Sequence, residues 1–396
     1  MIADSSPKQG MAGVLGLFAD PYRGTHKLNV QQSKVLYAIE NCRTAALGGH
    51  VLSCSCCGHT RVFYNSCRNR HCPQCQGLNR ERWVDKLASE LLPVSYFHIV
   101  FTISSQLNTL ALFNQECIYD LLFKAASQAL LMLARDGQHL GAETGMVALL
   151  HTWGQNLMDH PHLHTLIPAG GWDTTAQCWK SSRRKFFIPV KVISKVFRGK
   201  FLAHLKEAYA DKKLKLEGQN EHLQKKDNFK KLLDELYAKP WVVYAKAPFK
   251  KPAHLIRYLG RYTHRIAISN DRIKSIDQSG VSFTWKDYRD HNRYKTMKLS
   301  GEEFIRRFLL HVLPKGFCKI RYYGIFASRN RKTAWDKCKK FFGYQTVRSR
   351  LKGLTWKKAL EIVCGINVEQ CPLCKEGVMV ITSIIARKRA PPSITT

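Results

Sequence analysis

Three histidines alternate with other residues in the segment His160-Pro161-His162-Leu163-His164. Successive side chains of a β-strand point to opposite faces of the sheet, so these three histidines share one face, whereas Leu163 and Ile167 share the other. Imidazoles with this spacing can bind one divalent metal ion from a rigid sheet, because imidazole is a common metal ligand. The segment therefore predicts a strand with an apolar face and a metal site on the opposite face.

A second apolar strand precedes these histidines and carries His151. If the two strands form a hairpin that turns near residues 157–158, His151 lies opposite His164 and Trp153 lies opposite His162. Side chains that face each other across a strand pair are close enough to share a ligand. His151 is therefore the first candidate for a third metal ligand.

Gln155 and His160 compete with His151 for this third position. The interpretation without a metal is a polar histidine cluster on the protein surface. Three alternating histidines in an otherwise apolar strand favour the metal site over that interpretation.

A large excess of positive charge indicates a polyanionic partner. The chain has 63 Lys and Arg against 29 Asp and Glu, a formal net charge of +34 over 396 residues. Nucleic acid is the partner that such a charge favours. A membrane surface is the alternative, but no stretch of about 18 apolar residues occurs, and residues 11–19 are too short for a signal peptide or an anchor. We expect a cytoplasmic protein that binds nucleic acid and has no membrane partner and no small-molecule substrate.

The 14 cysteines predict metal binding, since disulfides are rare in the cytoplasm. Two Cys-x-x-Cys motifs, separated by fourteen residues, are typical of a zinc ribbon with four thiolate ligands. The predicted structural zinc ligands are Cys54, Cys57, Cys72 and Cys75. Three further residues of this region are spare ligands that leave room for a second ion or an exchanged ligand: Cys56, Cys67 and His71.

Arginines surround these motifs, and Arg70 is the one we expect to contact DNA. Basic zinc ribbons usually contact phosphates or base edges, although a solvated basic face would have the same composition. A further motif, Cys371-Pro372-Leu373-Cys374, has no obvious partner pair, although Cys338 and Cys364 lie upstream. It leaves open whether the C-terminal region binds a second zinc ion.

The order of predicted elements indicates an α+β fold. A helix at 80–92, a strand at 96–103 and a long helix at 108–135 precede the two strands of the histidine hairpin. This order favours an antiparallel sheet with helices packed on it. Residues 180–231 contain 16 Lys and Arg against 5 Asp and Glu, and we interpret them as a basic, mostly helical insertion.

A helix predicted after Pro252 carries two tyrosines, Tyr258 and Tyr262, one turn apart. Their hydroxyls can therefore reach one region of space. Three arginines repeat every four residues beside them and could present a phosphate to a tyrosine hydroxyl. These predicted DNA-binding residues are Arg257, Arg261 and Arg265. Core packing is the alternative, because Leu255, Leu259, Tyr262 and Ile266 also form an apolar stripe.

With these motifs identified, most of the chain resembles the two-tyrosine HUH transposases of rolling-circle insertion sequences. The name HUH describes two histidines separated by a hydrophobic residue. The likeness rests on three motifs in the same order: Arg70 to Gln76 around the second cysteine pair, His160 to His164, and Tyr258-Leu259-Gly260-Arg261-Tyr262.

The resemblance implies that Tyr258 and Tyr262 are the catalytic nucleophiles and that His162 and His164 bind Mg²⁺ or Mn²⁺. It leaves the third ligand open. It also implies an enzyme that nicks and rejoins single-stranded DNA at transposon ends and targets through a 5′-phosphotyrosine. Host replication or helicase factors would then separate the strands, because no Walker or helicase motif is evident, and the protein would be associated with a prokaryotic nucleoid.

The expected organisation is an N-terminal zinc ribbon followed by an HUH-type antiparallel sheet with helices. We predict a helical lead-in at 1–48, the zinc ribbon at 49–93, the catalytic domain at 94–330 with the insertion at 180–235, and a basic C-terminal region at 331–396. Two other functions fit the same motifs. One is a replication initiator or relaxase with the same chemistry, and the other is a non-catalytic, zinc-dependent DNA-binding protein.

Overall fold

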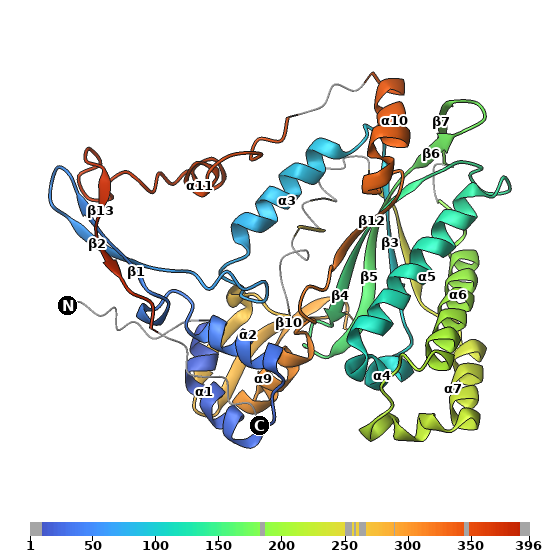
Figure 1. Ribbon diagram of the computed structural model, residues 1–396, viewed down its shortest axis with the longest axis horizontal. Coiled ribbons are helices and arrows are strands. Elements are labelled where there is room, and N and C mark those ends of the chain that lie inside the picture. Colours follow the sequence, from blue (N-terminus) through green and yellow to red (C-terminus); the bar gives the residue numbers. More distant parts are fainter. Residues whose placement is uncertain are drawn as a thin grey trace.

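A five-stranded antiparallel sheet forms the centre of the computed structural model (Figure 1). The structure describes residues 10–182, 187–249, 256, 259–260, 267–288, 290–343 and 348–388. The strand order is β12-β4-β5-β3-β8, with every neighbouring pair antiparallel. The strands are β3 (Tyr96–Thr102), β4 (Gly145–Trp153), β5 (Asp159–Pro168), β8 (Val243–Phe249) and β12 (Ile320–Gly324). The predicted α+β class is confirmed, and the histidine strand β5 is the central strand.

Helices cover one face of this sheet (Figure 1). Alternation along the strands directs Phe101, Leu150 and Leu163 into a large apolar core against these helices. The helices are α4 (Asn108–Phe113), α5 (Gln115–Arg135), α6 (Val190–Ala210) and α7 (Lys226–Ala238). The predicted basic insertion corresponds to α6 and α7, joined through a 3-10 turn at Gly218–Gln224.

Helix α5 is long and apolar enough to cross a membrane by length and composition alone. Most of it is buried inside the protein, where it packs on β4, β5 and α6. A core helix satisfies the same length and composition criteria, and the packing of α5 accounts for its apolar character.

The opposite face of the sheet packs against α3 (Gly77–Glu90). Leu87 of α3 shares a core with Leu149 of β4 and Leu166 of β5, and Ile256 and Leu259 are buried in the same core. This face also carries the histidines, since His162 and His164 have the same alternation as Leu166. Helix α3, which precedes β3 in the chain, therefore lies on the face of the sheet that carries the candidate site.

A second core joins the N-terminal helices to a distant part of the chain. Met11 and Val14 of the first helix are buried with Phe283 and Phe304. Asn29 begins the second helix with a capping box, in which its side chain accepts from the Gln32 amide and the Gln32 side chain accepts from the Asn29 amide. The elements of this unit are α1 (Met11–Thr25), α2 (Val30–Glu40), β9 (Ile273–Asp277), β10 (Gly280–Asp287), β11 (Arg293–Leu299) and α9 (Gly301–Leu310).

A small three-stranded sheet lies apart from the main body (Figure 1). Its order is β13-β1-β2, with β1 (Gly49–Cys54), β2 (Thr60–Tyr64) and β13 (Met379–Ile385). The C-terminal region reaches it through α11 (Trp356–Cys364), which packs on α3. A separate hairpin of β6 (Gly170–Asp173) and β7 (Cys178–Ser181) contacts α10 (Asp336–Phe341). The domain boundaries predicted from the sequence stay predictions, but residues from both ends of the chain meet in this sheet.

Gly324 at the end of β12 provides a test of the edge of the sheet. It has φ +60°, and an added Cβ would overlap the carbonyl oxygen of Thr144. Gly316 is a matched control, because its φ is +78° and none of the described residues would contact its Cβ within 4 Å. We expect Gly324→Ala to lower the free energy of unfolding by about 3 kcal/mol, and Gly316→Ala by about 1 kcal/mol, in urea denaturation. Equal losses would show that the close approach to Thr144 contributes nothing.

Candidate functional site

Three buried histidines meet on the α3 side of the sheet. The ring nitrogens of His151, His162 and His164 all lie within 4.8 Å of one another. His151 comes from β4, whereas the other two come from the central strand β5. The structure therefore brings together the three residues predicted as ligands of one metal ion.

The pairing of the two strands differs from the prediction by two residues. His151 is paired with His162 rather than with His164, and Leu149 faces His164. Trp153 is paired with Asp159 after an irregularity in the ladder, so the predicted pairing of Trp153 with His162 is also wrong. A two-residue shift returns every side chain to the same face, because side-chain direction alternates with period two. The predicted cluster consequently survives the error in register.

The two competing ligand candidates have other surroundings. The carbonyl oxygen of His160 accepts a hydrogen bond from Nδ1 of His162 at 2.6 Å, while His160 itself is exposed. The side-chain amide of Gln155 donates to the Tyr288 hydroxyl at 3.4 Å. Among the described histidines, His160 is not part of the group of mutually close ring nitrogens. His151 is thus the candidate that the geometry favours.

Burial favours the neutral form of two of these imidazoles, His162 and His164. It lowers the pKa of His162 to about 3 and the pKa of His164 well below its ordinary value. A neutral imidazole has one N–H and one nitrogen lone pair, and the lone pair is what binds a metal. With the proton of His162 on Nδ1, directed at the His160 carbonyl, its Nε2 presents a lone pair to the cluster.

The next histidine is oriented by a residue that sequence analysis missed. Nδ1 of His164 lies 2.9 Å from Nε2 of His98, a buried residue of β3. When His164 donates through Nδ1 in this pair, its Nε2 also presents a lone pair. The signal in the sequence was a histidine inside the otherwise apolar strand at 96–103, which we read only as a buried strand.

The spacing of these nitrogens fits a metal ion. Nε2 of His162 and Nε2 of His164 are 3.1 Å apart. Two ligands held at a right angle about 2.1 Å from an octahedral ion lie about 3.0 Å apart. Two facing lone pairs at this distance repel each other unless a cation lies between them. The donor set therefore suits a divalent ion held by three imidazoles, with further coordination positions available to a substrate.

The predicted tyrosine and arginine residues of the helix after Pro252 lie outside the described residues. They are Tyr258, Tyr262, Arg257, Arg261 and Arg265. Three neighbours in the same segment are described: Ile256, Leu259 and Gly260 are helical, and the first two are buried against the α3 side of the sheet. A Cβ added to Gly260 would lie 2.5 Å from the side chain of Val84 in α3. The described residues Ile256 and Leu259 therefore pack on the same sheet face as the histidines.

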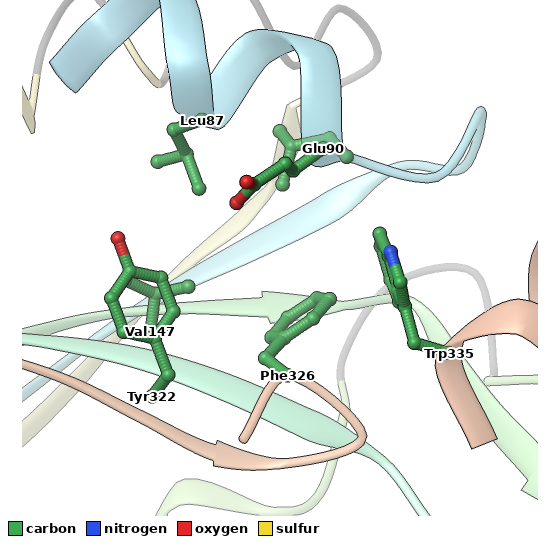
Figure 2. A pocket seen from close by; sticks show the side chains of 7 residues that line it. Leu87, Glu90, Val147, Tyr322, Phe326 and Trp335 are labelled. Atoms are coloured by element: carbon green, nitrogen blue, oxygen red, sulfur yellow. The ribbon is translucent and has the colours of Figure 1, made fainter. Parts of the chain in front are cut away.

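A small apolar pocket lies farther along this face (Figure 2). Leu87 and Glu90 of α3 point toward Val147 and Phe326 on the sheet side, and Trp335 closes one end (Figure 2). Val147 is four residues before His151 on β4, so the pocket is separated from the histidine cluster. The pocket belongs to the packing of α3 on the sheet rather than to the metal centre.

The four cysteines predicted as one zinc site are divided between two clusters. Cys72 and Cys75 lie with Cys42 and Cys67, whereas Cys54 and Cys57 lie at a second cluster. The predicted grouping is therefore wrong. Its cause is the β1–β2 hairpin, which carries the first cysteine pair to its far end, and a strand of six residues extends about 20 Å. The spacing of the cysteines in the sequence does not reveal this separation in space.

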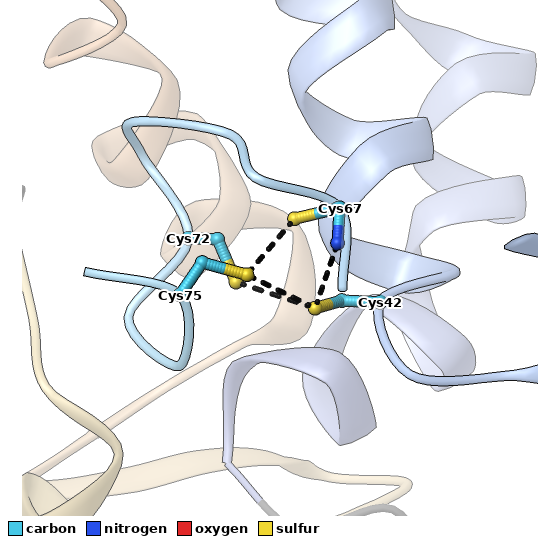
Figure 3. Close-up of side chains that lie close together, drawn as sticks. All are labelled: Cys42, Cys67, Cys72 and Cys75. Carbon is cyan, nitrogen blue, oxygen red and sulfur yellow. Dashed lines mark hydrogen bonds between the residues drawn. The ribbon is translucent and has the colours of Figure 1, made fainter. Parts of the chain in front are cut away.

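The first cluster has the geometry of a tetrahedral metal site (Figure 3). The sulfur of Cys42 lies 3.4 Å from that of Cys75 and 3.7 Å from that of Cys72, and the sulfurs of Cys67 and Cys75 are 3.6 Å apart. Four sulfurs placed tetrahedrally about 2.3 Å from a zinc ion lie about 3.8 Å from one another. Cys42, at the end of α2, was missed because it lay within the predicted helical lead-in.

Of the three spare ligands, Cys67 belongs to this cluster, whereas Cys56 and His71 do not. Nε2 of His71 accepts a hydrogen bond from the Leu313 amide at 3.1 Å, and its buried ring has its pKa lowered to about 3 by burial. The guanidinium of Arg70 is half-buried and donates to the Phe317 carbonyl at 2.7 Å. Both side chains therefore connect the cysteine region to the segment before β12, and DNA contact by Arg70 stays a prediction.

Replacing Cys42 tests the first cluster. We expect Cys42→Ser to release one zinc ion per chain, because a structural zinc site needs all four ligands. Zinc content after dialysis against a chelator, measured by mass spectrometry, gives the result. Cys178→Ser, in β7 and outside both clusters, is the control and should retain all zinc. Unchanged zinc in Cys42→Ser would exclude Cys42 as a ligand.

Comparisons with known proteins agree with this geometry. The profile of a family described as "Putative transposase" matches residues 145–334, and that of a family described as "Transposase zinc-binding domain" matches residues 14–103. A "Putative transposase y4qJ" of Sinorhizobium fredii is 43% identical over 394 residues, which cover 99% of this chain and 98% of that protein.

A second relative is the transposase for insertion sequence element IS801 of Pseudomonas savastanoi pv. phaseolicola. It is 26% identical over 294 residues, which cover 73% of this chain and 68% of that protein. No solved structure matches the chain significantly. The zinc-binding profile contains the whole first cysteine cluster, and the other profile contains the histidine cluster. The resemblance stated from the motifs is confirmed: the chain belongs to the family of insertion-sequence transposases that carry an N-terminal zinc-binding domain.

Proposed function

We propose that this transposase nicks and rejoins single-stranded DNA at insertion-sequence ends through a covalent phosphotyrosine. The observation that carries the proposal is the cluster of His151, His162 and His164 on the central strand of an antiparallel sheet and the strand beside it. Three imidazole ligands would leave coordination positions on the ion that an oxygen ligand such as a phosphate can take. A purely DNA-binding protein would have no use for such a site.

In this proposal, His151, His162 and His164 would hold Mg²⁺ or Mn²⁺, which would polarise and orient the scissile phosphate. The protein itself supplies the nucleophile. A tyrosine hydroxyl attacks the phosphorus, the P–O3′ bond breaks, and the leaving 3′ oxygen takes up a proton. The phosphotyrosine retains the energy of the phosphodiester, so the 3′-OH of another strand can rejoin it without an external energy source. Two tyrosines allow one covalent intermediate for each DNA end.

Tyr258 and Tyr262 are the proposed nucleophiles. Their described neighbours Ile256 and Leu259 are buried on the α3 side of the sheet, which is also the side of the histidines. If the segment forms the helix predicted from the sequence, two buried apolar residues on one side restrict where its other side chains can point. This packing supports a tyrosine position near the metal centre. The arginines Arg257 and Arg261, which repeat one turn apart, are proposed to hold the DNA backbone.

The charge of the chain supports DNA as the substrate. The formal net charge of +34 favours binding to phosphates, and both relatives are named as transposases. We propose that the partners are single-stranded transposon ends and target DNA in the bacterial nucleoid, with host replication or helicase factors separating the strands. The name of the IS801 relative favours insertion-sequence ends over a plasmid origin as the substrate.

Removal of the tyrosine hydroxyls tests the nucleophiles. Tyr→Phe removes one oxygen, so the free energy of unfolding should change by about 1 kcal/mol or less. We expect the double variant Tyr258→Phe/Tyr262→Phe to form no covalent adduct with labelled single-stranded end DNA in denaturing gels with Mn²⁺. Each single variant should stop complete transposition, although it can still cleave if the two tyrosines substitute for each other.

Tyr237→Phe is the matched control, because Tyr237 is exposed on α7, away from the sheet. It should form the adduct at the wild-type rate. Mass spectrometry of the wild-type adduct locates the modified residue. A modified tyrosine outside the helix after Pro252 would refute this assignment.

Removal of the histidines tests the metal centre separately. We expect His162→Ala and His164→Ala each to slow cleavage at least about 100-fold, because a polarising ion contributes several kcal/mol to the barrier. DNA affinity and unfolding temperature should stay near the wild-type values. His222→Ala, at an exposed position after α6, is the control. Full cleavage by a His162→Ala/His164→Ala variant would remove the metal from the proposal.

A further inference from the structure

A second cluster of four cysteines joins the two ends of the chain. The sulfurs of Cys54, Cys57, Cys371 and Cys374 all lie within 4.8 Å of one another. Cys54 and Cys374 are 3.6 Å apart, and Cys57 and Cys371 are 3.8 Å apart. These separations exclude disulfides, whose sulfurs are about 2.05 Å apart, and match the roughly 3.8 Å expected around a tetrahedral zinc ion.

The two cysteine pairs have matching backbone turns. Gly58 follows the first pair with φ 68°, and Lys375 follows the second with φ 64°. In the first turn the amide of Cys56 donates to the sulfur of Cys54 at 3.3 Å, and in the second the amide of Gly377 donates to the sulfur of Cys374 at 3.3 Å. Such N–H donors stabilise a thiolate, which is the form that binds a metal.

Gly377 is shaped to this cluster. A Cβ at this position would overlap the sulfur of Cys54 and would lie 2.8 Å from Cβ of Cys56. The glycine thus lets the C-terminal turn approach the N-terminal turn closely enough for the four sulfurs to meet. The amide of Ser55 also donates to the Val378 carbonyl at 3.0 Å, which ties the turns together beside the cysteines.

Apart from its backbone hydrogen bonds, the small sheet β13-β1-β2 has little apolar packing. Its buried apolar cluster consists of Cys54, Cys371 and Met379. All residues of β2 are exposed, as are most of β13. A sheet with such a small core needs another source of stability, and in small units a metal commonly provides it. Two of the three core residues belong to the cysteine cluster itself.

We propose that Cys54, Cys57, Cys371 and Cys374 bind a second structural zinc ion, which fixes the C-terminal strand β13 onto β1. The pair at 371 and 374 lies outside both matched family profiles, which cover residues 14–103 and 145–334. A tetrahedral set of four thiolates selects zinc or iron, and zinc is the ion proposed here. The zinc ion would thereby attach the C-terminal region to the zinc-binding domain near the N-terminus.

Zinc stoichiometry of the full chain tests this proposal. Zinc and iron are measured by mass spectrometry after dialysis against a chelator, in a His162→Ala/His164→Ala background that removes metal binding by the histidines. We expect two zinc ions per chain in this background and one after Cys371→Ser/Cys374→Ser. Cys56→Ser is the matched control, because Cys56 lies in the same turn but outside the cluster, and it should keep two.

Two further measurements keep the test decisive if the cysteine variant folds poorly. Gly377→Ala leaves all ligands in place but obstructs the approach of the turns, so it should weaken retention of one zinc ion. Hydrogen exchange should show the β13 amides protected in the metal-loaded protein and unprotected in both variants. One zinc ion per chain in the background protein, iron in place of the second zinc, or unchanged zinc after Cys371→Ser/Cys374→Ser would overturn the proposal.

Discussion

The two faces of β5 are the constraint on which the main body of this transposase depends. Hydrogen bonding to β4 on one side and β3 on the other fixes the strand in register. Its apolar face, with Leu163, is anchored in the core under α5, so the histidine face must point to α3. A slip of one residue would exchange the two faces and bury the imidazoles under α5. Core packing thus determines where the histidines of the candidate site lie.

Burial of the histidine cluster has an electrostatic consequence. Desolvation lowers the pKa of His162 and His164, so both rings are neutral at physiological pH. Their Nδ1 atoms are occupied by the His160 carbonyl and by His98, which leaves the Nε2 atoms facing each other. When both Nε2 atoms present lone pairs, a cation between them offsets their mutual repulsion. Support for the ligands therefore comes from a neighbouring strand as well as from the histidine strand itself.

The two cysteine clusters of the zinc-binding part lie in different surroundings. Its first cysteine cluster is embedded in an apolar core, where Cys42 and Cys72 pack with α1, α2 and β10. Its small sheet has almost no core, and its strands come from both ends of the chain. Arg82 and Asp85 of α3 form hydrogen bonds with residues 349–354 of the C-terminal region and hold it against this helix. The contact between the N-terminal and C-terminal regions is therefore a property of the tertiary structure.

The sequence by itself determined the features that depend on local periodicity and chemistry. The alternation around His162 predicted the strand, the face that carries the three histidines and the α+β class. The error of two residues in the pairing of His151 left that face unchanged, because side chains alternate with period two. The tertiary structure alone decided which cysteines meet and that His98 orients His164. The physical reason is that a hairpin or a returning chain places residues together independently of their separation in sequence.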